Sequence, residues 1–238
     1  MVEPAEGLRE RKKRQMRQLL SDTATQMFID RGFDAVRVSE VAAACGVSEK
    51  TVFNYFRTKE SLLLDRLDAT EASLRTGLAD RAVAPVQAAL AILAAELFGL
   101  TSMLQTHDRP AELIDKYRRV GAMIRSTPSL RAHQSDSLDK VVAIAGSILA
   151  ERAGLEPDAP EAQVAATALL ALWPVQYRAL GKYLDKTRTP EQIRQAVTAE
   201  VQRAARLVDQ GLSSLAAFDG PASATGSTPS PGRRKVKD

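Results

Sequence analysis

The 238-residue sequence contains one cysteine, Cys45, so no disulfide can form within the chain. A long apolar run is missing as well. A membrane helix needs about 18 uninterrupted apolar residues, and the most apolar segment, 88–100, is broken by Glu96. The first residues also lack the apolar core of a signal peptide. We therefore expect a cytoplasmic protein with no membrane partner.

Motifs of catalytic and metal sites are missing too. The sequence has no glycine-rich phosphate loop, no paired cysteines at metal-binding spacing and no His-Glu-x-x-His. Its only histidines, His107 and His133, have no partner pattern. We therefore expect no enzyme, and neither a cofactor nor a metal.

Signals of β-strands are absent, and helical spacing is found instead. No segment alternates apolar and polar residues, and no Asn-Gly or Asp-Gly turn joins apolar runs. Apolar residues recur at helical intervals, separated by breaks rich in Pro, Ser, Thr or Gly. The pattern predicts an all-α fold. The expected helices are a first one ending at Gly32, one over 59–80, one around 90–100, and four over 111–125, 130–153, 161–186 and 190–216.

Residues 38–56 have the spacing of a helix-turn-helix. Gly46 can take the left-handed conformation of a tight turn, Ser48 can cap the next helix, and the small Ala42 lets the two helices cross closely. The second helix presents Glu49, Lys50, Thr51, Phe53 and Asn54 near its N-terminus, the end that enters a DNA major groove. Taken alone, this short segment also fits an ordinary pair of antiparallel helices.

The longer segment over residues 10–64 resembles the DNA-binding segment of TetR-family transcriptional regulators. The resemblance rests on Gly32-Phe33, Val41-Ala42, Gly46-Val47-Ser48, Tyr55-Phe56, Lys59-Glu60 and Leu62-Leu63, in the family's order and spacing. It implies a three-helix DNA-binding domain over 1–58 and a helical effector-binding and dimerisation domain over 59–218. The expected partners are a palindromic operator of double-stranded DNA, a second copy of the chain, and a small-molecule effector that releases the repressor. A DNA-binding or scaffold protein without an effector site remains the alternative.

The resemblance also assigns DNA contacts. It implies base-edge or nearby groove contacts for Lys50, Thr51 and Asn54, and phosphate contacts for Tyr55 and Lys59. The full set expected at DNA is Arg37, Ser48, Glu49, Lys50, Thr51, Phe53, Asn54, Tyr55 and Lys59. Three alternatives stay open: Lys59 as a solvated side chain, Tyr55 as a core residue, and Phe53 packed internally rather than on a thymine methyl.

One position departs from the family, which has Thr or Ser as a helix cap where Arg37 stands. Arginine cannot accept the capping hydrogen bond, so Ser39 is the candidate cap and Arg37 a candidate phosphate contact. The basic run over 9–17 is either a solvated helix face or an arm along the DNA backbone or minor groove.

The larger domain offers candidates for effector binding. Pro174 inside a helical stretch predicts a kink near Trp173 and Tyr177. The expected pocket residues are Phe98, Met103, Tyr117, Met123, Trp173 and Tyr177, each of which also suits a core position. Their character predicts an apolar or amphipathic effector. The helix over 59–80 is expected to act as a lever between this pocket and the DNA-binding domain.

The last helix carries a continuous apolar stripe. Its members are Ile193, Val197, Val201, Ala205, Val208 and Leu212. The stripe either closes the core of the monomer or, as the resemblance implies and as we favour, forms the dimer interface. The Gly-, Pro- and Ser-rich stretch over 219–238 predicts a disordered basic tail.

Overall fold

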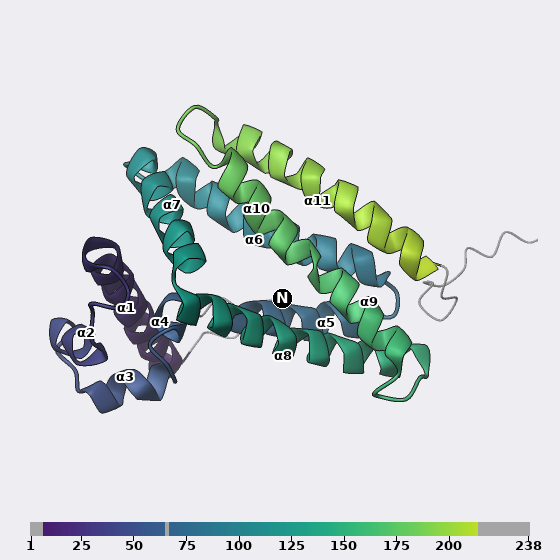
Figure 1. Cartoon of the computed structure of the whole chain (residues 1–238), viewed down its shortest axis with the longest axis horizontal. Helices are drawn as coiled ribbons and strands as arrows, with labels where there is room; N and C mark the ends of the chain where they lie inside the picture. Colours follow the sequence, from purple (N-terminus) through teal and green to yellow (C-terminus); the bar gives the residue numbers. More distant parts are fainter. Residues whose placement is uncertain (1–6, 65–66, 214–238) are drawn as a thin grey trace, which may run out of the picture.

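The computed structural model describes residues 7–64 and 67–213, and every regular element in these ranges is an α-helix (Figure 1). The prediction of an all-α fold is confirmed. The expected tail over 219–238 lies outside the described residues.

Four helices lie together at one end of the molecule (Figure 1). They are α1 (Leu8–Arg31), α2 (Val38–Ala44), α3 (Glu49–Tyr55) and α4 (Ser61–Leu64). The long α1 ends at Gly32, as expected, with φ of +87°. Its side chains Leu20, Ala24 and Phe28 are fully buried and form the centre of a small core, because their spacing of four residues places them on one face.

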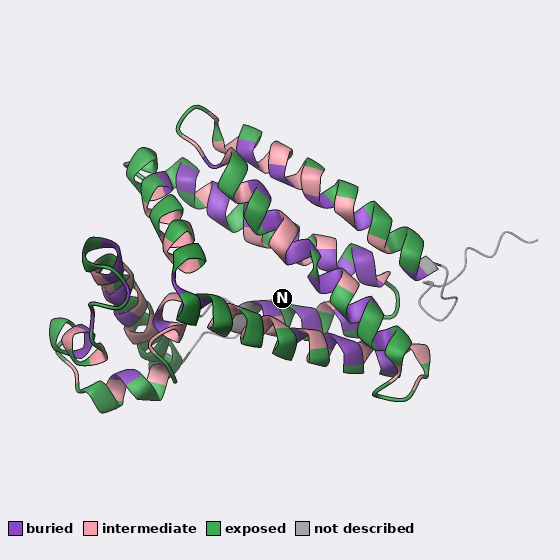
Figure 2. Ribbon diagram, viewed as in Figure 1, coloured by how far each residue is buried: buried purple, intermediate pink, exposed green. Residues whose placement is uncertain are grey.

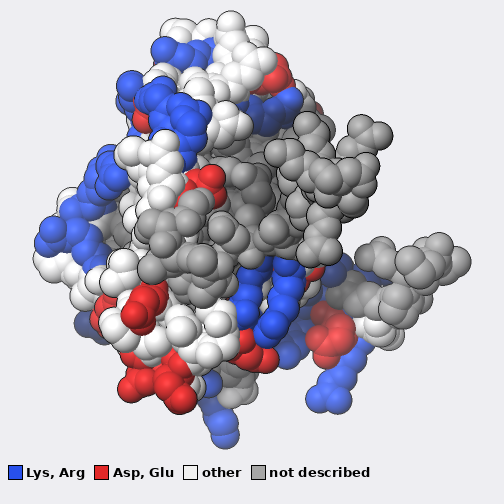
Figure 3. All heavy atoms as spheres, turned by 90° about the vertical axis from the view of Figure 1, so that its right-hand side faces the viewer, with Lys and Arg blue, Asp and Glu red and all other residues white. Residues whose placement is uncertain are grey.

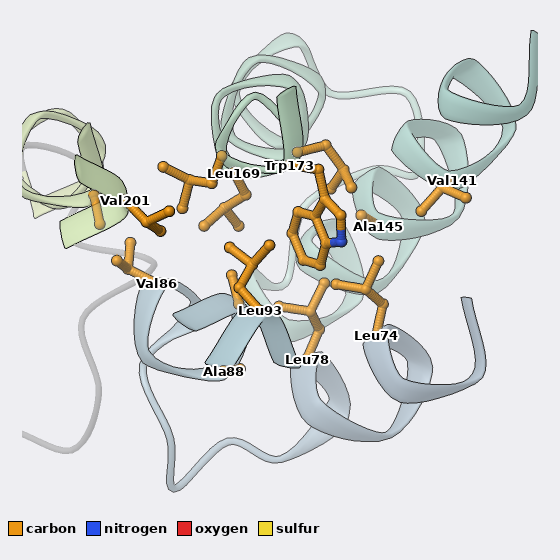
Figure 4. Packing of buried hydrophobic residues seen from close by; sticks show 14 of the residues in the cluster. Leu74, Leu78, Val86, Ala88, Leu93, Val141, Ala145, Leu169, Trp173 and Val201 are labelled. Carbon is orange, nitrogen blue, oxygen red and sulfur yellow. The ribbon is translucent and has the colours of Figure 1, made fainter. Parts of the chain in front are cut away.

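Seven helices form the larger domain. They are α5 (Leu67–Ala79), α6 (Pro85–Thr106), α7 (Pro110–Ser126), α8 (Pro128–Ala153), α9 (Pro160–Leu170), α10 (Leu172–Tyr183) and α11 (Pro190–Ser213). Five of them begin with proline, whose missing N–H costs nothing in the first turn of a helix. Their shared core surrounds Trp173, with Leu74 and Leu78 of α5 and Ala145 of α8 around the indole (Figure 4).

The helix expected over 161–186 is divided at Ala171 into α9 and α10. Pro174 lies three residues past this break, in the first turn of α10, where its lack of an N–H is tolerated. The interruption predicted near Trp173 is thus present as a break between two helices, whereas Tyr177 lies inside α10. The helix expected over 59–80 is present as α4 and α5, which lie on either side of residues 65–66 outside the described ranges.

The apolar stripe of α11 is buried within the monomer. Ile193 and Val197 are fully buried, and Val201 is 3% exposed. Figure 2 shows that α11 is buried on the side facing α6 and α10 and exposed on the opposite side, and Figure 4 shows Val201 near Val86 of α6. Our preference for this stripe as the dimer interface is wrong, because α6 is apolar around most of its circumference and needs α11 to cover it.

Helix α6 also bears on the expectation that the chain has no membrane segment. By length and composition it would suffice to cross a membrane, with a mean hydropathy of 1.6 over its most apolar window. Core helices of soluble proteins meet the same criterion, and α6 packs against α5, α9, α10 and α11. Its side chains Leu93 and Leu97 belong to the core of the larger domain.

The two domains share packing at the bend between α7 and α8. Leu130, in the first turn of α8, is fully buried in the core of the N-terminal helices, and Met123 and Ile124 of α7 pack against the same core. The guanidinium of Arg119 on α7 donates a 2.6 Å hydrogen bond to the carbonyl oxygen of Ile29 in α1. The small core therefore includes side chains of α7 and α8 as well as those of α1 to α4.

Candidate nucleic-acid interface

The turn between α2 and α3 is a Schellman motif. The backbone N–H of Val47 donates to the carbonyl oxygen of Ala42 at 3.0 Å, and that of Gly46 donates to Ala43 at 3.1 Å. Gly46 has a φ of +67°, in the left-handed region that favours glycine. Ala42 is 1% exposed at the point where the two helices cross. This backbone geometry fixes the direction in which α3 leaves the turn.

The start of α3 is capped as the sequence predicts. The Ser48 hydroxyl accepts a hydrogen bond from the backbone N–H of Thr51 at 3.1 Å, and the two hydroxyls lie 2.8 Å apart. Ser48 and Thr51 thus stabilise the helix end that would face a groove. Glu49, Lys50 and Asn54 are exposed on the same helix.

Two aromatic residues of α3 have different surroundings. Phe53 is 44% exposed, so it does not pack internally, and it is available to an external partner. Tyr55 is half-buried and packs against the small core. Its ring therefore has a structural role beside any contact with a phosphate.

The start of α2 corrects one expectation. Arg37 is the N-cap residue and α2 begins at Val38, so Ser39 lies inside the first turn and is not the cap. Glu40 accepts hydrogen bonds from the Arg37 backbone N–H at 2.7 Å and from the Arg31 guanidinium at 2.8 Å. These two donors hold the pKa of Glu40 below its usual value. The Arg37 side chain has no capping bond and is exposed.

Arg17 of α1 holds the far end of α3. Its Nη1 donates a 2.8 Å hydrogen bond to the carbonyl oxygen of Tyr55, the last residue of α3, and its guanidinium lies 4.8 Å from the centre of the Phe56 ring. From the sequence alone, Arg17 was predicted only as part of the basic run, and its hydrogen bond to Tyr55 was not expected. The signal was its register, because it lies three residues before the buried Leu20, on the core side of α1.

Lys59 lies against aromatic rings. Its Nζ is 4.4 Å from the centre of the Phe33 ring and 5.8 Å from that of Phe28, and the residue is half-buried. It follows Thr58, whose hydroxyl accepts from the Ser61 N–H while the Ser61 hydroxyl accepts from the Thr58 N–H, both at 3.2 Å. Lys59 is therefore not a fully solvated side chain, and the residue lies two positions before the start of α4.

The two domains differ in charge. Residues 7–64 contain eleven Lys and Arg against seven Asp and Glu, a net charge of +4, whereas residues 67–213 contain seventeen of each. Exposed cations along the start of α1 make up much of this excess: Arg9, Arg11, Lys12, Lys13 and Arg14. At the end of the molecule far from α2 and α3, Figure 3 shows basic and acidic side chains interspersed. Among the described residues, the net positive charge thus lies on the domain that carries the helix-turn-helix.

Comparison with known proteins identifies the family. The family model described as "Bacterial regulatory proteins, tetR family" matches residues 20–65, and a TetR C-terminal model described as "MftR C-terminal domain" matches residues 100–217. The chain belongs to the TetR family. Proteins of this family are DNA-binding regulators of transcription, which agrees with the exposed α3 on a basic domain.

Relatives of this TetR-family chain are transcriptional regulators by name. The HTH-type transcriptional regulator TcmR of Streptomyces glaucescens is 27% identical over 156 residues, which cover 64% of this chain and 66% of TcmR. The HTH-type transcriptional regulator BetI of Rhizobium meliloti is 42% identical over 73 residues, covering 31% of this chain and 34% of BetI. The chain thus spans less than two thirds of the length of these relatives.

A solved structure covers more of the chain at lower similarity. FadR of Thermus thermophilus, a TetR-family transcriptional repressor in complex with lauroyl-CoA, is 20% identical and has a TM-score of 0.46. The match covers 91% of this chain and 100% of FadR.

The six expected effector residues do not surround one cavity. Phe98, Met103 and Tyr177 are exposed by 58%, 47% and 41%, whereas Trp173 is 1% exposed. Tyr117 is half-buried against the large core, and Met123 packs against the small one. A cavity of about 400 Å³ at the junction of α6, α7 and α11 is lined by none of the six. In the described part of the chain, no cluster of three or more His, Cys, Asp or Glu side chains is arranged to hold a metal.

Proposed function

We propose that this protein is a dimeric repressor of the cytoplasm that binds a palindromic operator and is released from it by a small apolar or amphipathic effector. The observation that carries the proposal is the helix-turn-helix itself. Its Schellman turn, its Ser48 cap and the Arg17 bond to its far end together present α3 as a rigid, exposed helix on a basic domain. That is the arrangement needed to enter a major groove.

The side chains of α3 divide by chemistry. The exposed Lys50 and Asn54 can bond to base edges, lysine to guanine and asparagine to adenine, and Phe53 can contact a thymine methyl group. Arg37, Tyr55 and the exposed cations of α1 are suited to phosphates. Lys59, whose ammonium group lies against the Phe33 ring, is a further candidate for a phosphate contact.

A dimer follows from the small size of one recognition helix, which reads too few base pairs to find a site in a genome. Two copies of α3 would lie about 34–36 Å apart, or a multiple of that distance. The outer faces of α9 and α11 support this assembly, because Val164 and Leu207 are exposed by 65% and 73%. These outer positions replace the buried α11 stripe as the proposed interface.

Control by an effector requires a connection between the domains. The helix α4 provides one such connection, since its Leu62 is fully buried in the small core and the helix also contacts α8 of the larger domain. The bend between α7 and α8 contributes a second, through Leu130 and the Arg119–Ile29 hydrogen bond. An effector that favours a different α7 position would move the recognition helix, provided that it binds that state better than the DNA-binding state.

The proposal is tested by selecting bound sites from a random duplex library and measuring affinity for the selected site. Lys50→Ala and Asn54→Ala should relax the sequence preference, each losing roughly 1–3 kcal/mol of discrimination per base contact. Lys140→Ala, an exposed lysine on α8, is the matched control and should leave affinity unchanged. A protein that retains no duplex at low salt refutes the proposed function.

A further inference from the structure

The cavity of about 400 Å³ lies where the end of α6 meets the starts of α7 and α11. Its floor is apolar, because it is lined by Leu104 of α6, Ile114 of α7 and Ile193 of α11, which are buried in the core of the larger domain. Ala111 also lines it and is exposed, so the cavity opens to the surface. Sites for small molecules typically have volumes of about 300–1,000 Å³. The cavity can therefore take a small ligand without any separation of the core helices.

The charged residues that line the cavity are both basic. They are Lys186 and Arg188, from the connection 184–189 between α10 and α11. The ammonium group of Lys186 has three N–H donors and uses one of them in a 2.6 Å hydrogen bond to Asp115 of α7. The guanidinium of Arg188 has five N–H donors and bonds to Asp185 through Nη1. Among the described residues, no carboxylate lines the cavity, so both cations can donate to an anionic group within it.

Two helix N-termini add to this positive charge. Pro110 is the first residue of α7 and Pro190 the first residue of α11, and both line the cavity. The N-terminus of a helix carries a partial positive charge from the aligned peptide dipoles. Glu112 and Glu191, in the first turns of these helices, are each paired with an arginine three residues away and do not line the cavity. The surroundings of the cavity thus favour a negatively charged group over a neutral or positive one.

We propose that this cavity is the effector site and that the effector is an amphipathic anion, with a carboxylate or phosphate group on an aliphatic chain. This inference rests on the proposed function and gives its effector a site and a charge. The chain would lie on Leu104, Ile114 and Ile193, which removes apolar surface from water. The anionic group would accept charge-assisted hydrogen bonds from Lys186 and Arg188.

Helix α7 connects this cavity with the DNA-binding domain. Asp115 of α7 bonds to Lys186 at the cavity, and Arg119, one turn later, donates the 2.6 Å hydrogen bond to the carbonyl oxygen of Ile29 in α1. An anion at Lys186 competes with Asp115 for the ammonium group and so weakens the contact that holds the start of α7. A ligand that binds more tightly to the free protein than to the DNA-bound protein lowers the affinity for DNA by the same factor.

The test uses octanoate, octyl phosphate, octanol and octylammonium, which share one chain length and differ in head group, each below its micelle concentration. Binding to the full chain is measured by isothermal titration calorimetry. The tighter of the two anions should bind about tenfold or more tightly than octanol, because only an anion forms charge-assisted bonds with the two cations. Octylammonium should bind most weakly. Tighter binding of octanoate would identify a carboxylate effector, and tighter binding of octyl phosphate a phosphate one.

Variants locate the binding site. Lys186→Gln should reduce the preference for the anion, and Lys186→Gln together with Arg188→Gln should abolish it. The matched control is Lys182→Gln, which removes a lysine that is also ion-paired, to Glu200 at 2.8 Å, but does not line the cavity. It should preserve the preference. Ala111→Phe places a large side chain in the opening of the cavity and should weaken the binding of all four compounds.

Affinity for the selected duplex is measured in parallel on the same protein, and a saturating concentration of the anion should lower it about fivefold or more. Equal binding of the four compounds, binding of none of them, an unchanged preference in the double variant, or anion binding that leaves duplex affinity unchanged would each overturn the inference. If the double variant does not fold, unchanged binding to Ala111→Phe overturns it instead. Retained duplex binding without a preference for the anion overturns only this inference, whereas loss of all duplex binding in the absence of ligand refutes the proposed function.

Discussion

Replacing Arg17 separates a helix-positioning role from a contact with DNA phosphate. Arg17→Ala removes the 2.8 Å hydrogen bond to the Tyr55 carbonyl oxygen and the contact with the Phe56 ring. A hydrogen bond from a charged group contributes about 1.5–3 kcal/mol, and an exposed cation–π contact about 0.5–1 kcal/mol. Since Arg17 is only half-buried, we expect the low end of these ranges, a combined loss of about 2 kcal/mol in the stability of the N-terminal helices.

The two roles differ in their salt dependence. Each cation that binds a phosphate contributes about one to the slope of log affinity against log salt. Arg17→Ala should weaken binding to the selected duplex, because the end of α3 is no longer held, and should leave that slope unchanged. Arg17→Lys should fall between the wild type and Arg17→Ala, since lysine keeps the charge but lacks the planar fork.

Lys13→Ala is the matched control, an exposed cation one turn earlier on α1. If the start of α1 follows the DNA backbone, this variant should lower the slope by about one without changing thermal stability. Our reasoning would be refuted by an Arg17→Ala protein with unchanged stability and a reduced slope. That result would identify Arg17 as a phosphate contact.

Three further predictions concern the fold, the assembly and acid stability. Gly46→Ala should lower the free energy of unfolding by about 1 kcal/mol, measured by thermal denaturation. At the Gly46 φ of +67° an added Cβ strains the backbone but meets no neighbouring atom, so a larger loss would contradict this reasoning. Val201→Glu should unfold the monomer, seen by circular dichroism, whereas Leu207→Glu should leave it folded and lower the native mass to one chain; a folded Val201→Glu monomer would reverse our assignment. The lowered pKa of Glu40 means that its contribution to stability is present above its unfolded pKa and lost as the pH falls through its folded pKa. Glu40→Gln should therefore lose less stability on acidification, and parallel acid titrations of the two proteins would contradict this.

Local signals were sufficient for much of the N-terminal domain. The Gly46 turn and the Ser48 cap are set by residues within five positions of each other, so their spacing identifies them. The break at Ala171, close to Trp173, could likewise be predicted from the sequence, since proline acts on its own helix. The cap at Ser39 was predicted wrongly, since α2 already begins at Val38, with Arg37 as the N-cap residue and Glu40 accepting a hydrogen bond from the Arg37 N–H.

Contacts between distant segments could not be predicted from such local patterns. The register of Arg17 on α1 indicates which way it points, but not that the carbonyl of Tyr55, 38 residues later, lies there. The expected effector residues were selected by type, and type does not distinguish the buried Trp173 from the exposed Phe98. The hydrogen bonds that Glu96 accepts come from Thr70 of α5 and Trp173 of α10, on either side of it in the chain.

Local sequence patterns are sufficient to predict that the protein is helical, where its recognition helix begins and which family it resembles, because helix period, caps and turns depend on neighbouring residues. The identity of the apolar face that is buried in the monomer depends on the packing of distant helices. The α11 stripe has the same pattern whether it covers α6 or a second chain, since burial removes apolar surface from water equally in both cases. The positions of α6 and α10 beside α11 resolve this ambiguity, and they leave Val164 and Leu207 on the outside.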